Sequence, residues 1–471
     1  MAQGHMIPMI DIAKMLAQHG VIVTIVTTQL NAKRVAAPLA RAVESGLQIK
    51  SVEIQFPWQE AGLPYESENF DMLPSLGLGY GIFAAANMVQ EPVERLFEVL
   101  TPRPTCIISD ICLPYTSNVA TKFGIPRISF SGFSCFCTLC LHNIQISNVL
   151  QSVNSESELF VVPGLPDHIE LAPNHLPSAM VDTKTFPAQV ADAEMLKHGF
   201  IINSFEELEP AYVHEYKRAV GEKVWCIGPV SLCNKDDVDK VQRGNKSSID
   251  ESKCLKWLDS QQPRSVIYVC LGSLCNLTTS QLIELGLGLE ASNKPFIWVT
   301  RGGEKSRELG NWFEENGFKE RTKGRGLIIQ GWAPQVVILS HSAIGGFLTH
   351  CGWNSILEGI SAGLPMVTWP LFGDQFCNEK LVVEVLKIGV KVGSEVTLRW
   401  GEEEKFGVLV KKEKVKNAVD RLMNEGEEGE ERRKRAQELS KMANKAVEEE
   451  GSSYLNMKLL IEDIRQLAFV E

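Results

Sequence analysis

The chain has 471 residues and a net charge of −11, and 44% of its residues are hydrophobic. This length is too great for one core and predicts two domains of ordinary size, while the negative charge argues against a nucleic-acid partner. The sequence has no apolar stretch long enough to span a bilayer and no signal-peptide pattern at its start. Its twelve cysteines lack the spacing of a disulfide framework or a zinc site, so we expect a cytoplasmic protein with reduced cysteines.

The first predicted elements are a helix over residues 6–18, with Pro8 near its start, and a β-branched buried strand over residues 21–28. In a doubly wound α/β sheet, a strand precedes the first helix and is normally the central one. Because Met1 to Gly4 are all that stands before His5, we predict that the sequence is truncated and lacks this first strand. Losing a strand of about five buried apolar residues would forfeit about 10 kcal/mol of burial, which is comparable to the stability of a domain.

The first domain contains further predicted strands, at residues 48–55, 105–109, 127–130, 200–203 and 224–227. Asp110 and Ser131 follow two of these strands at their carboxyl ends, where doubly wound sheets bind ligands. We therefore expect Asp110 on the ligand side with His5, although Asp110 could also cap a following helix. Long loops rich in aromatic residues and methionine lie between the strands, at 56–69, 72–80, 133–136 and 180–186. We interpret them as walls of an apolar pocket, with mobile surface loops as the alternative.

Residues 232–252 are polar, charged and without periodicity, which is typical of an interdomain linker. The linker contains a D-x-D pattern at Asp237 and Asp239, which we interpret as solvated charge rather than a metal site. A second series of strands is predicted at 265–270, 296–300, 327–330, 344–349, 366–369 and 389–392. Ser273 lies in the turn after the first of them, and the tail from Lys414 is helix-forming and dense in charge.

The most informative stretch begins at Trp332 and ends at Gln375. It joins the buried strand 344–349 to a helix over residues 353–362 through a sharp turn that starts at His350. Such a turn directs backbone N–H groups and the positive end of the helix dipole toward a bound anion, most often a phosphate.

Two polar residues, Asn354 and Ser355, lie in the first turn of this helix, where they could cap it or donate to the phosphate. Glu358 lies four residues after Asn354 on the same helix face, where its carboxylate could accept two hydrogen bonds from a ribose diol. Taken singly, each residue could have an ordinary structural role. Together they predict a nucleotide site.

Over its full length the stretch WAPQVVILSHSAIGGFLTHCGWNSILEGISAGLPMVTWPLFGDQ resembles the signature of plant family 1 UDP-glycosyltransferases. The resemblance implies an α/β fold of the GT-B type, in which two Rossmann-like doubly wound domains face each other across a cleft. We expect an acceptor-binding domain at 1–231, the linker at 232–252, a UDP-sugar-binding domain at 253–450, and a C-terminal helix at 451–471 that packs back on the first domain.

The resemblance also implies inverting transfer of glucose from UDP-glucose to a hydroxyl of a small apolar plant metabolite, such as a flavonoid, a triterpenoid or another phenolic or terpenoid compound. His5 would be the catalytic base, and Asp110 would orient it. The residues implied in binding the UDP-sugar are Gly4, Ser131, Ser273, Trp332, Ala333, Gln335, His350, Trp353, Asn354, Ser355, Glu358, Asp374 and Gln375. Among them, Trp332 would stack on uracil, and Gln375 together with Trp353 indicates glucose as the donor sugar.

The resemblance implies no metal and no cofactor beyond the UDP-glucose substrate, and we expect a monomer. One alternative is a truncated homologue that binds a UDP-sugar or another small molecule without catalysis, which a turnover measurement would distinguish. Another is a two-domain enzyme of similar architecture, such as a sugar-nucleotide epimerase or a phosphorylase, against which the long signature argues.

Overall fold

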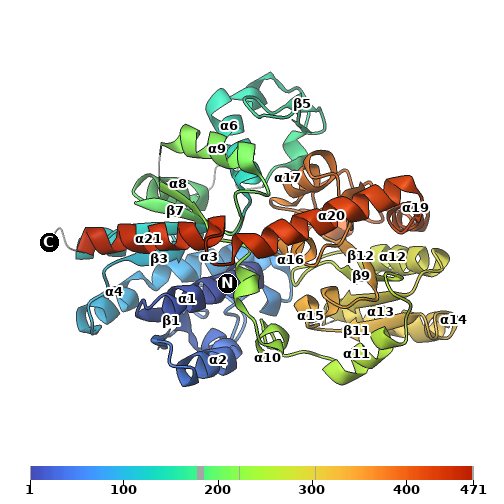
Figure 1. Cartoon of the computed structure of the whole chain (residues 1–471), viewed down its shortest axis with the longest axis horizontal. Coiled ribbons are helices and arrows are strands. Elements are labelled where there is room, and N and C mark those ends of the chain that lie inside the picture. Colours follow the sequence, from blue (N-terminus) through green and yellow to red (C-terminus); the bar gives the residue numbers. More distant parts are fainter. Residues whose placement is uncertain (1, 178–184, 222, 303, 469–471) are drawn as a thin grey trace. The chain divides into compact units, whose positions relative to one another are not determined.

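A computed structural model describes residues 2–177, 185–221, 223–302 and 304–468 of the chain (Figure 1). The chain divides into two units, each of which is described by itself. Unit 1 comprises residues 1–142, 177–234 and 443–471, and unit 2 comprises residues 143–176 and 235–442. Segment 143–176 therefore groups with unit 2, whereas the sequence analysis placed it in the first domain.

The parallel strands of unit 1 form two sheets, with the strand orders β1-β2 and β3-β4-β7-β8. The strands are β1 (Val23–Thr28), β2 (Ile49–Ile54), β3 (Ile107–Asp110), β4 (Arg127–Ser131), β7 (Gly199–Ile202) and β8 (Lys223–Cys226). The helices are α1 (Gln3–Gln18), α2 (Gln29–Glu44), α3 (Gly79–Met88), α4 (Gln90–Val99), α5 (Tyr115–Phe123), α6 (Cys135–Ser147, of which residues 143–147 group with unit 2), α8 (Thr185–Met195), α9 (Pro210–Val220) and α21 (Ser452–Ala468). Every predicted strand of this region forms within two residues of its expected start.

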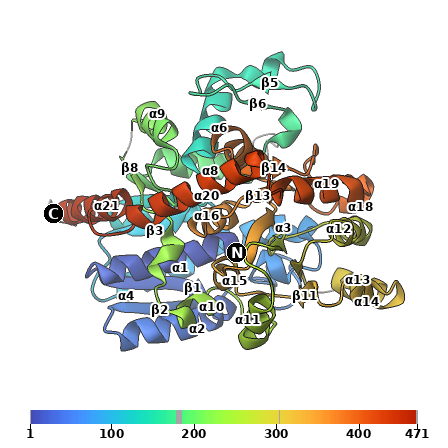
Figure 2. The same ribbon diagram turned by 45° about the vertical axis from the view of Figure 1, so that its right-hand side comes forward.

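Two apolar clusters hold unit 1 together. Ala13 and Ala17 of α1 pack with Val35 and Leu39 of α2 against β1 and β2, where the two helices lie side by side (Figure 2). On the four-stranded sheet, the other cluster joins α1 to the strands and to α21, with Met457 among its buried residues. The C-terminal helix is thus part of the core of unit 1, because it covers apolar strand residues that would otherwise face water.

Unit 2 is built on a parallel sheet with the strand order β11-β10-β9-β12-β13-β14. The strands are β9 (Val266–Cys270), β10 (Phe296–Thr300), β11 (Gly326–Gln330), β12 (Ile344–Thr349), β13 (Met366–Thr368) and β14 (Gly389–Lys391). The helices are α10 (Asp237–Val241), α11 (Glu251–Asp259), α12 (Thr279–Ala291), α13 (Glu304–Glu315), α14 (Phe318–Arg321), α15 (Gln335–Leu339), α16 (Trp353–Ser361), α17 (Gln375–Lys380), α18 (Glu403–Phe406), α19 (Lys412–Leu422) and α20 (Glu427–Ala446), whose residues 443–446 group with unit 1. This is the order of a doubly wound sheet, and the order reverses between β9 and β12.

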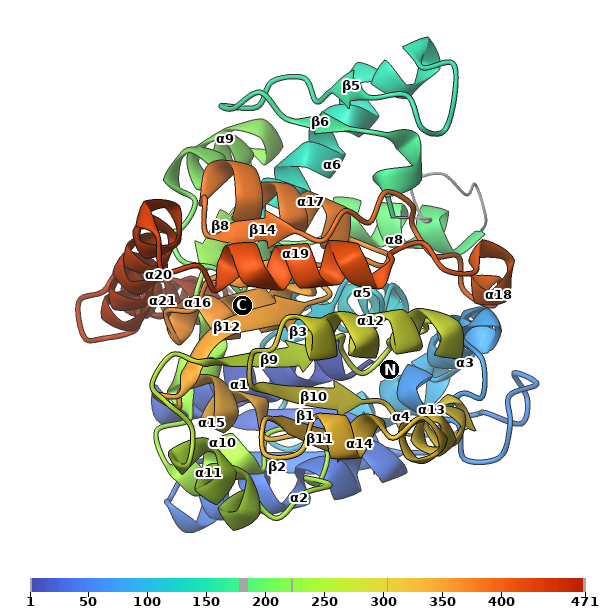
Figure 3. The ribbon, with the colours of Figure 1, turned by 90° about the vertical axis from the view of Figure 1, so that its right-hand side faces the viewer.

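Successive side chains of β9 alternate between the two faces of this sheet. Ile267 and Val269 pack in one large apolar cluster with residues of α12 and α19, which lie side by side over the strands in Figure 3. Tyr268 points to the opposite face, where its ring contacts Phe347 at a centroid separation of 5.3 Å. Both faces of the sheet are buried, as expected for a parallel sheet.

Several local predictions are corrected by the structure. The first helix begins at Gln3 rather than at residue 6, so His5 lies in its first turn and not in a preceding loop. The apolar cysteine run forms α6 from Cys135 onward, which converts half of the predicted loop 133–136 into helix. The predicted linker contains α10 and the first residues of α11. Most of the predicted loop 180–186 lies outside the described residues.

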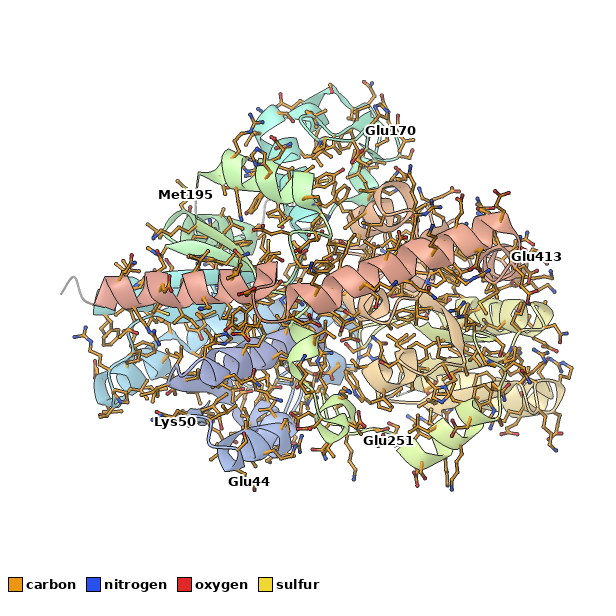
Figure 4. The ribbon with its side chains drawn as sticks, in the orientation of Figure 1. Glu44, Lys50, Glu170, Met195, Glu251 and Glu413 are labelled. Carbon is orange, nitrogen blue, oxygen red and sulfur yellow. The ribbon has the colours of Figure 1, made fainter. Side chains whose placement is uncertain are left out.

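Charged side chains are distributed over the surfaces of both units (Figure 4). Glu44 on α2 and Lys50 on β2 are exposed on unit 1, and Glu413 on α19 is exposed on unit 2. Opposite charges are therefore interspersed on unit 1. Within the described part of the chain, no helix combines the length and the apolar character needed to cross a membrane.

Candidate functional site

In unit 1, the first turn of α1 brings His5 against the carboxyl end of β3. The Nδ1 atom of His5 lies 2.7 Å from Oδ2 of Asp110, and the side chains are 31% and 8% exposed. The second oxygen of Asp110, Oδ1, accepts a hydrogen bond of 2.8 Å from the backbone N–H of Cys112. Asp110 therefore closes a local turn, whereas the following helix, α5, begins only at Tyr115. The carboxylate is held on both sides and points one oxygen at the imidazole.

The electrostatics of Asp110 favour its ionised form. Burial alone would raise the pKa of this carboxyl, but the charge and hydrogen bond of His5 and the N–H of Cys112 lower the pKa below its ordinary value. An ionised Asp110 accepts from His5, so the proton of a neutral imidazole resides on Nδ1 and Nε2 carries the lone pair.

Among the described residues, one group of at least three His, Cys, Asp or Glu side chains lies close enough together to hold a metal ion. It consists of His5, Asp110 and Cys112. Burial and the charge of Asp110 raise the pKa of the Cys112 thiol well above its ordinary value. Metals bind the thiolate rather than the thiol, so this environment disfavours Cys112 as a ligand. The contacts present fit an acid–base pair better than a metal site.

Gly4 and Ser131 lie close to this pair. A Cβ atom placed on Gly132, at the end of β4, would stand 3.9 Å from the carbonyl oxygen of Gly4 and 4.0 Å from Cε1 of His5. The side chain of Ser131 is buried, and its Oγ accepts a hydrogen bond of 3.2 Å from the N–H of Phe133. The start of α1 and the end of β4 therefore adjoin.

In unit 2, two strand ends meet where the strand order reverses. Cys270 and Thr349 are register partners at the ends of β9 and β12, and the turns that follow them carry Ser273 and His350. In doubly wound sheets the crevice at this point is where ligands bind. The topology thus places Ser273 and His350 at the carboxyl ends of β9 and β12, where the sequence predicted them.

The His350 ring is held between two glycines. A Cβ atom on either Gly272 or Gly352 would run into the ring, and Gly272 also has φ = +79°, which favours glycine. Burial lowers the pKa of His350 to about 4, although a backbone hydrogen bond with Cys270 partly opposes this effect. Its Nδ1 atom is buried without a hydrogen-bond partner, an arrangement that suits a ligand atom arriving from outside the chain.

Helix α16 begins directly after this turn, at Trp353. Its N-cap residue is Gly352, which has no side chain to accept from the first N–H groups. Asn354 and Ser355 lie in the first turn, where the helix dipole is positive. The helix N-terminus is therefore built to receive an anion.

One turn farther along α16, Glu358 joins a hydrogen-bonded group. Gln335 donates from Nε2 to Oε2 of Glu358 at 2.8 Å and to Oγ of Ser355 at 3.2 Å. The hydroxyl of Tyr268 donates to Oε1 of Gln335 at 3.3 Å. Gln335 and Glu358 are therefore brought together at the start of α15 and on α16, next to Trp332 and the buried Ala333.

Arg243 was missed by the sequence analysis, because it lies in a stretch without periodicity. Its Nη1 atom forms an ion pair with Oε1 of Glu358, and the two side chains are 9% and 6% exposed. No local sequence pattern predicts that an arginine in a polar connecting segment will be buried. A contact between residues so far apart in the sequence can be identified only once the fold is known.

Asp374 and Gln375, expected to contact the sugar hydroxyls, both accept hydrogen bonds from residues that lie close to them in the sequence. Oε1 of the buried Gln375 accepts from the N–H groups of Leu371 at 2.8 Å and Phe372 at 3.1 Å. Oδ2 of Asp374 accepts from Nδ2 of Asn378 at 2.6 Å. The amide NH₂ of Gln375 is the group with which this side chain could meet a sugar.

Comparison with known proteins agrees with this geometry. The family model described as "UDP-glucoronosyl and UDP-glucosyl transferase" matches residues 232–440. The chain is 57% identical to UDP-glycosyltransferase 73C11 of Barbarea vulgaris, over 99% of this chain and 95% of that protein.

Two solved structures share the fold. Glycyrrhiza uralensis UGT73P12, complexed with glycyrrhetinic acid 3-O-monoglucuronide, is 37% identical with a TM-score of 0.92, and the match covers 100% of this chain and 95% of that chain. Medicago truncatula UGT71G1, complexed with UDP-glucose, is 25% identical with a TM-score of 0.75, and the match covers 98% of this chain and 96% of that chain. The predicted two-domain α/β fold of the GT-B type is confirmed. The chain belongs to the family of plant UDP-glycosyltransferases, enzymes that transfer a glycosyl group from a UDP-sugar to an acceptor.

Proposed function

We propose that the enzyme transfers glucose from UDP-glucose to a hydroxyl of a small apolar plant metabolite, with inversion at the anomeric carbon. The observation that carries this proposal is the contact of 2.7 Å between His5 and Asp110. An acceptor hydroxyl is a weak nucleophile at neutral pH, so a positioned base must remove its proton as it attacks. With Asp110 holding Nδ1, the lone pair of His5 Nε2 is the base.

In the proposed step, the acceptor oxygen forms a bond to C1 of glucose as the bond between C1 and the diphosphate oxygen breaks. The hydroxyl proton passes to Nε2 of His5, and UDP leaves with the electron pair of the broken bond. Asp110 fixes the tautomer of His5 and stabilises the imidazolium that forms. Attack from the face opposite the leaving group converts an α-linked donor into a β-glucoside.

The leaving diphosphate gains negative charge, which the N-terminus of α16 would stabilise with His350, Asn354, Ser355 and Ser273 and without a metal. The helix begins at a glycine N-cap, and the unpartnered Nδ1 of His350 supports this role. Because neutral His350 has one ring proton, its contribution depends on which nitrogen carries that proton.

The nucleoside would be held by the residues around α15. We assign stacking on uracil to Trp332, contacts with the nucleoside to Ala333 and Gln335, and the ribose diol to Glu358. Asp374 and Gln375 would contact the sugar. Trp353 is the residue that, together with Gln375, indicates glucose as the donor sugar. The UDP-glucose complex of Medicago truncatula UGT71G1 supports the choice of donor.

The acceptor would bind among aromatic side chains of unit 1. Phe83 on α3 stacks with Phe186 at a centroid separation of 4.2 Å and meets Phe70 edge-on at 5.3 Å. An apolar aromatic lining suits a flavonoid or terpenoid skeleton. The triterpenoid glycoside bound to Glycyrrhiza uralensis UGT73P12 supports the terpenoid class. A cytoplasmic monomer completes the proposal.

The test is product formation from UDP-glucose with a flavonol and with a triterpenoid alcohol. We expect acceptor-dependent UDP release and a β-glucoside, identified by the proton coupling at its anomeric carbon. An α-glucoside would overturn the inverting mechanism. UDP binding without any transfer would favour the alternative, a homologue that binds UDP-sugars without catalysis.

A further inference from the structure

The segment that connects to the nucleoside residues of unit 2 is attached to them at two points. Arg243 pairs with Glu358, as described above. Five residues later, the N–H of Ser248 donates to the carbonyl of Trp332 at 2.8 Å, and the N–H of Trp332 donates back to Oγ of Ser248 at 2.9 Å. The preceding helix, α10, lies beside α15 (Figures 1 and 2). The segment 243–248 is therefore a wall of the proposed donor site rather than a passive linker.

The contacts of Glu358 define what Arg243 does. Oε1 faces the guanidinium of Arg243, and Oε2 accepts from Gln335 at 2.8 Å. Each carboxylate oxygen has two lone-pair directions, so one on each oxygen is used by the protein and one is available to a ligand. Two adjacent hydroxyls, as in a ribose diol, match this arrangement.

The Glu358 carboxylate is buried, and a charge taken out of water is costly unless a partner of opposite charge lies against it. A rotated carboxylate would not present both acceptor positions to a ligand. Arg243 supplies the charge and also fixes the orientation, because its planar guanidinium holds a carboxylate more rigidly than a lysine does.

We infer that Arg243 is a positioning residue of the donor site: it holds the Glu358 carboxylate in the orientation that accepts both ribose hydroxyls, and thereby sets the preference for ribonucleotide over 2′-deoxyribonucleotide donors. This inference rests on the proposed function, since it assumes that Glu358 meets the ribose. Arg243 acts through Glu358 and is not itself assigned a contact with the substrate.

The test is calorimetric binding of UDP and of 2′-deoxy-UDP to the wild-type chain and to Arg243→Gln. We expect Arg243→Gln to weaken UDP binding by about tenfold or more, while binding of 2′-deoxy-UDP changes by less than about threefold, because only the diol uses both oriented oxygens. Arg243→Lys keeps the positive charge but lacks the planar guanidinium. It should therefore retain part of the preference for UDP over 2′-deoxy-UDP that Arg243→Gln loses.

Two controls separate positioning from folding. Lys240→Gln removes an ion pair with Asp237 in the preceding helix, α10, and should leave both affinities unchanged. Glu358→Gln should abolish the preference by itself, and adding Arg243→Gln to it should then have no further effect on the ratio of the two affinities. Thermal unfolding of each variant shows whether unit 2 remains folded.

The outcomes are distinct. If wild-type protein does not bind UDP, the proposed function fails. If wild-type protein prefers UDP and Arg243→Gln keeps the full preference, or loses both affinities equally, the positioning role is wrong. Tighter UDP binding by Arg243→Gln would also overturn it, because Arg243 would then block the site instead of preparing it.

Discussion

His5 and Asp110 are 105 residues apart in the chain, yet Nδ1 of the imidazole lies 2.7 Å from Oδ2 of the carboxylate. The contact exists because the first turn of α1 and the carboxyl end of β3 meet at the same edge of unit 1. A second hydrogen bond, from the N–H of Cys112, holds the other oxygen of Asp110. The pair is thus fixed before any substrate arrives, which is what a general base requires.

Replacement of Asp110 by asparagine should lower kcat by about 10²–10⁴, because the amide cannot stabilise the imidazolium and favours the wrong tautomer of His5. The affinity for UDP should stay unchanged, since the proposed UDP site is formed by other residues. Steady-state kinetics and calorimetry give the two quantities. Asp192→Asn, at an exposed position on α8, is the control and should match the wild type. A wild-type rate for Asp110→Asn would remove Asp110 from the mechanism.

Treatment with EDTA should leave the transfer rate unchanged, because in the proposed mechanism the N-terminus of α16 and His350 would stabilise the leaving diphosphate in place of a metal. Cys112→Ser, which removes the thiol from the possible metal group with His5 and Asp110, should change the rate by less than about threefold. Loss of activity with EDTA and its recovery on adding a divalent cation would contradict this. The measurement is the transfer rate after dialysis against EDTA, and again after dialysis against a divalent cation.

Gly352→Ala should weaken UDP binding by about tenfold, because the added methyl group runs into the His350 ring and displaces it from the turn. The backbone φ of Gly352 is −61°, which alanine adopts readily, so the effect is steric rather than conformational. The penalty should shrink in a His350→Ala background, where the ring is absent. An equal penalty in both backgrounds would show that the clash is not with His350.

The burial of His350 predicts a loss of stability in acid. Its folded-state pKa is about 4, below the ordinary 6.5, so the unfolded chain binds more protons between these values. Stability therefore falls as the pH decreases through this window, by up to about 2 kcal/mol at pH 5. Glu379 acts in the opposite sense, because burial raises its pKa to about 7 and folding then favours its protonated form.

Denaturant unfolding at pH 7 and pH 5, followed by tryptophan fluorescence, isolates the His350 contribution when the wild type is compared with His350→Gln. The variant should lose less stability on acidification than the wild type. His214→Gln, at an exposed position on α9, should behave as the wild type does. Identical pH dependence in all three proteins would show that His350 is not buried in its neutral form.

The sequence predicted the local structure of the proposed donor site well, because the signals for its strand, turn and helix are local. The apolar strand at 344–349, the turn at His350 and the helix from Trp353 all form where the pattern indicated. The pairing of His5 with Asp110 came from the resemblance to the family and from the rule that ligands bind at strand ends, and it is confirmed as a contact. Their catalytic roles remain predictions.

Features that depend on the fold could not be read from the sequence. The ion pair of Arg243 with Glu358 joins residues 115 positions apart, and nothing in the surrounding residues marks Arg243 as buried. Likewise, the sequence could not reveal that the carbonyl oxygen of Gln375 is used by the N–H groups of Leu371 and Phe372. Side-chain partners are chosen by tertiary packing, which local periodicity does not encode.

The proposal that His5 is the catalytic base is tested most directly by the variant His5→Ala. Its acceptor-dependent glucose transfer is measured at saturating UDP-glucose, and its binding of UDP is measured by calorimetry. We expect the variant to bind UDP as the wild type does and to transfer glucose at least about 100-fold more slowly. His214→Ala is the control on an exposed histidine and should remain active. If His5→Ala transferred glucose at the wild-type rate, His5 would not be the base, because another group would then have to remove the proton.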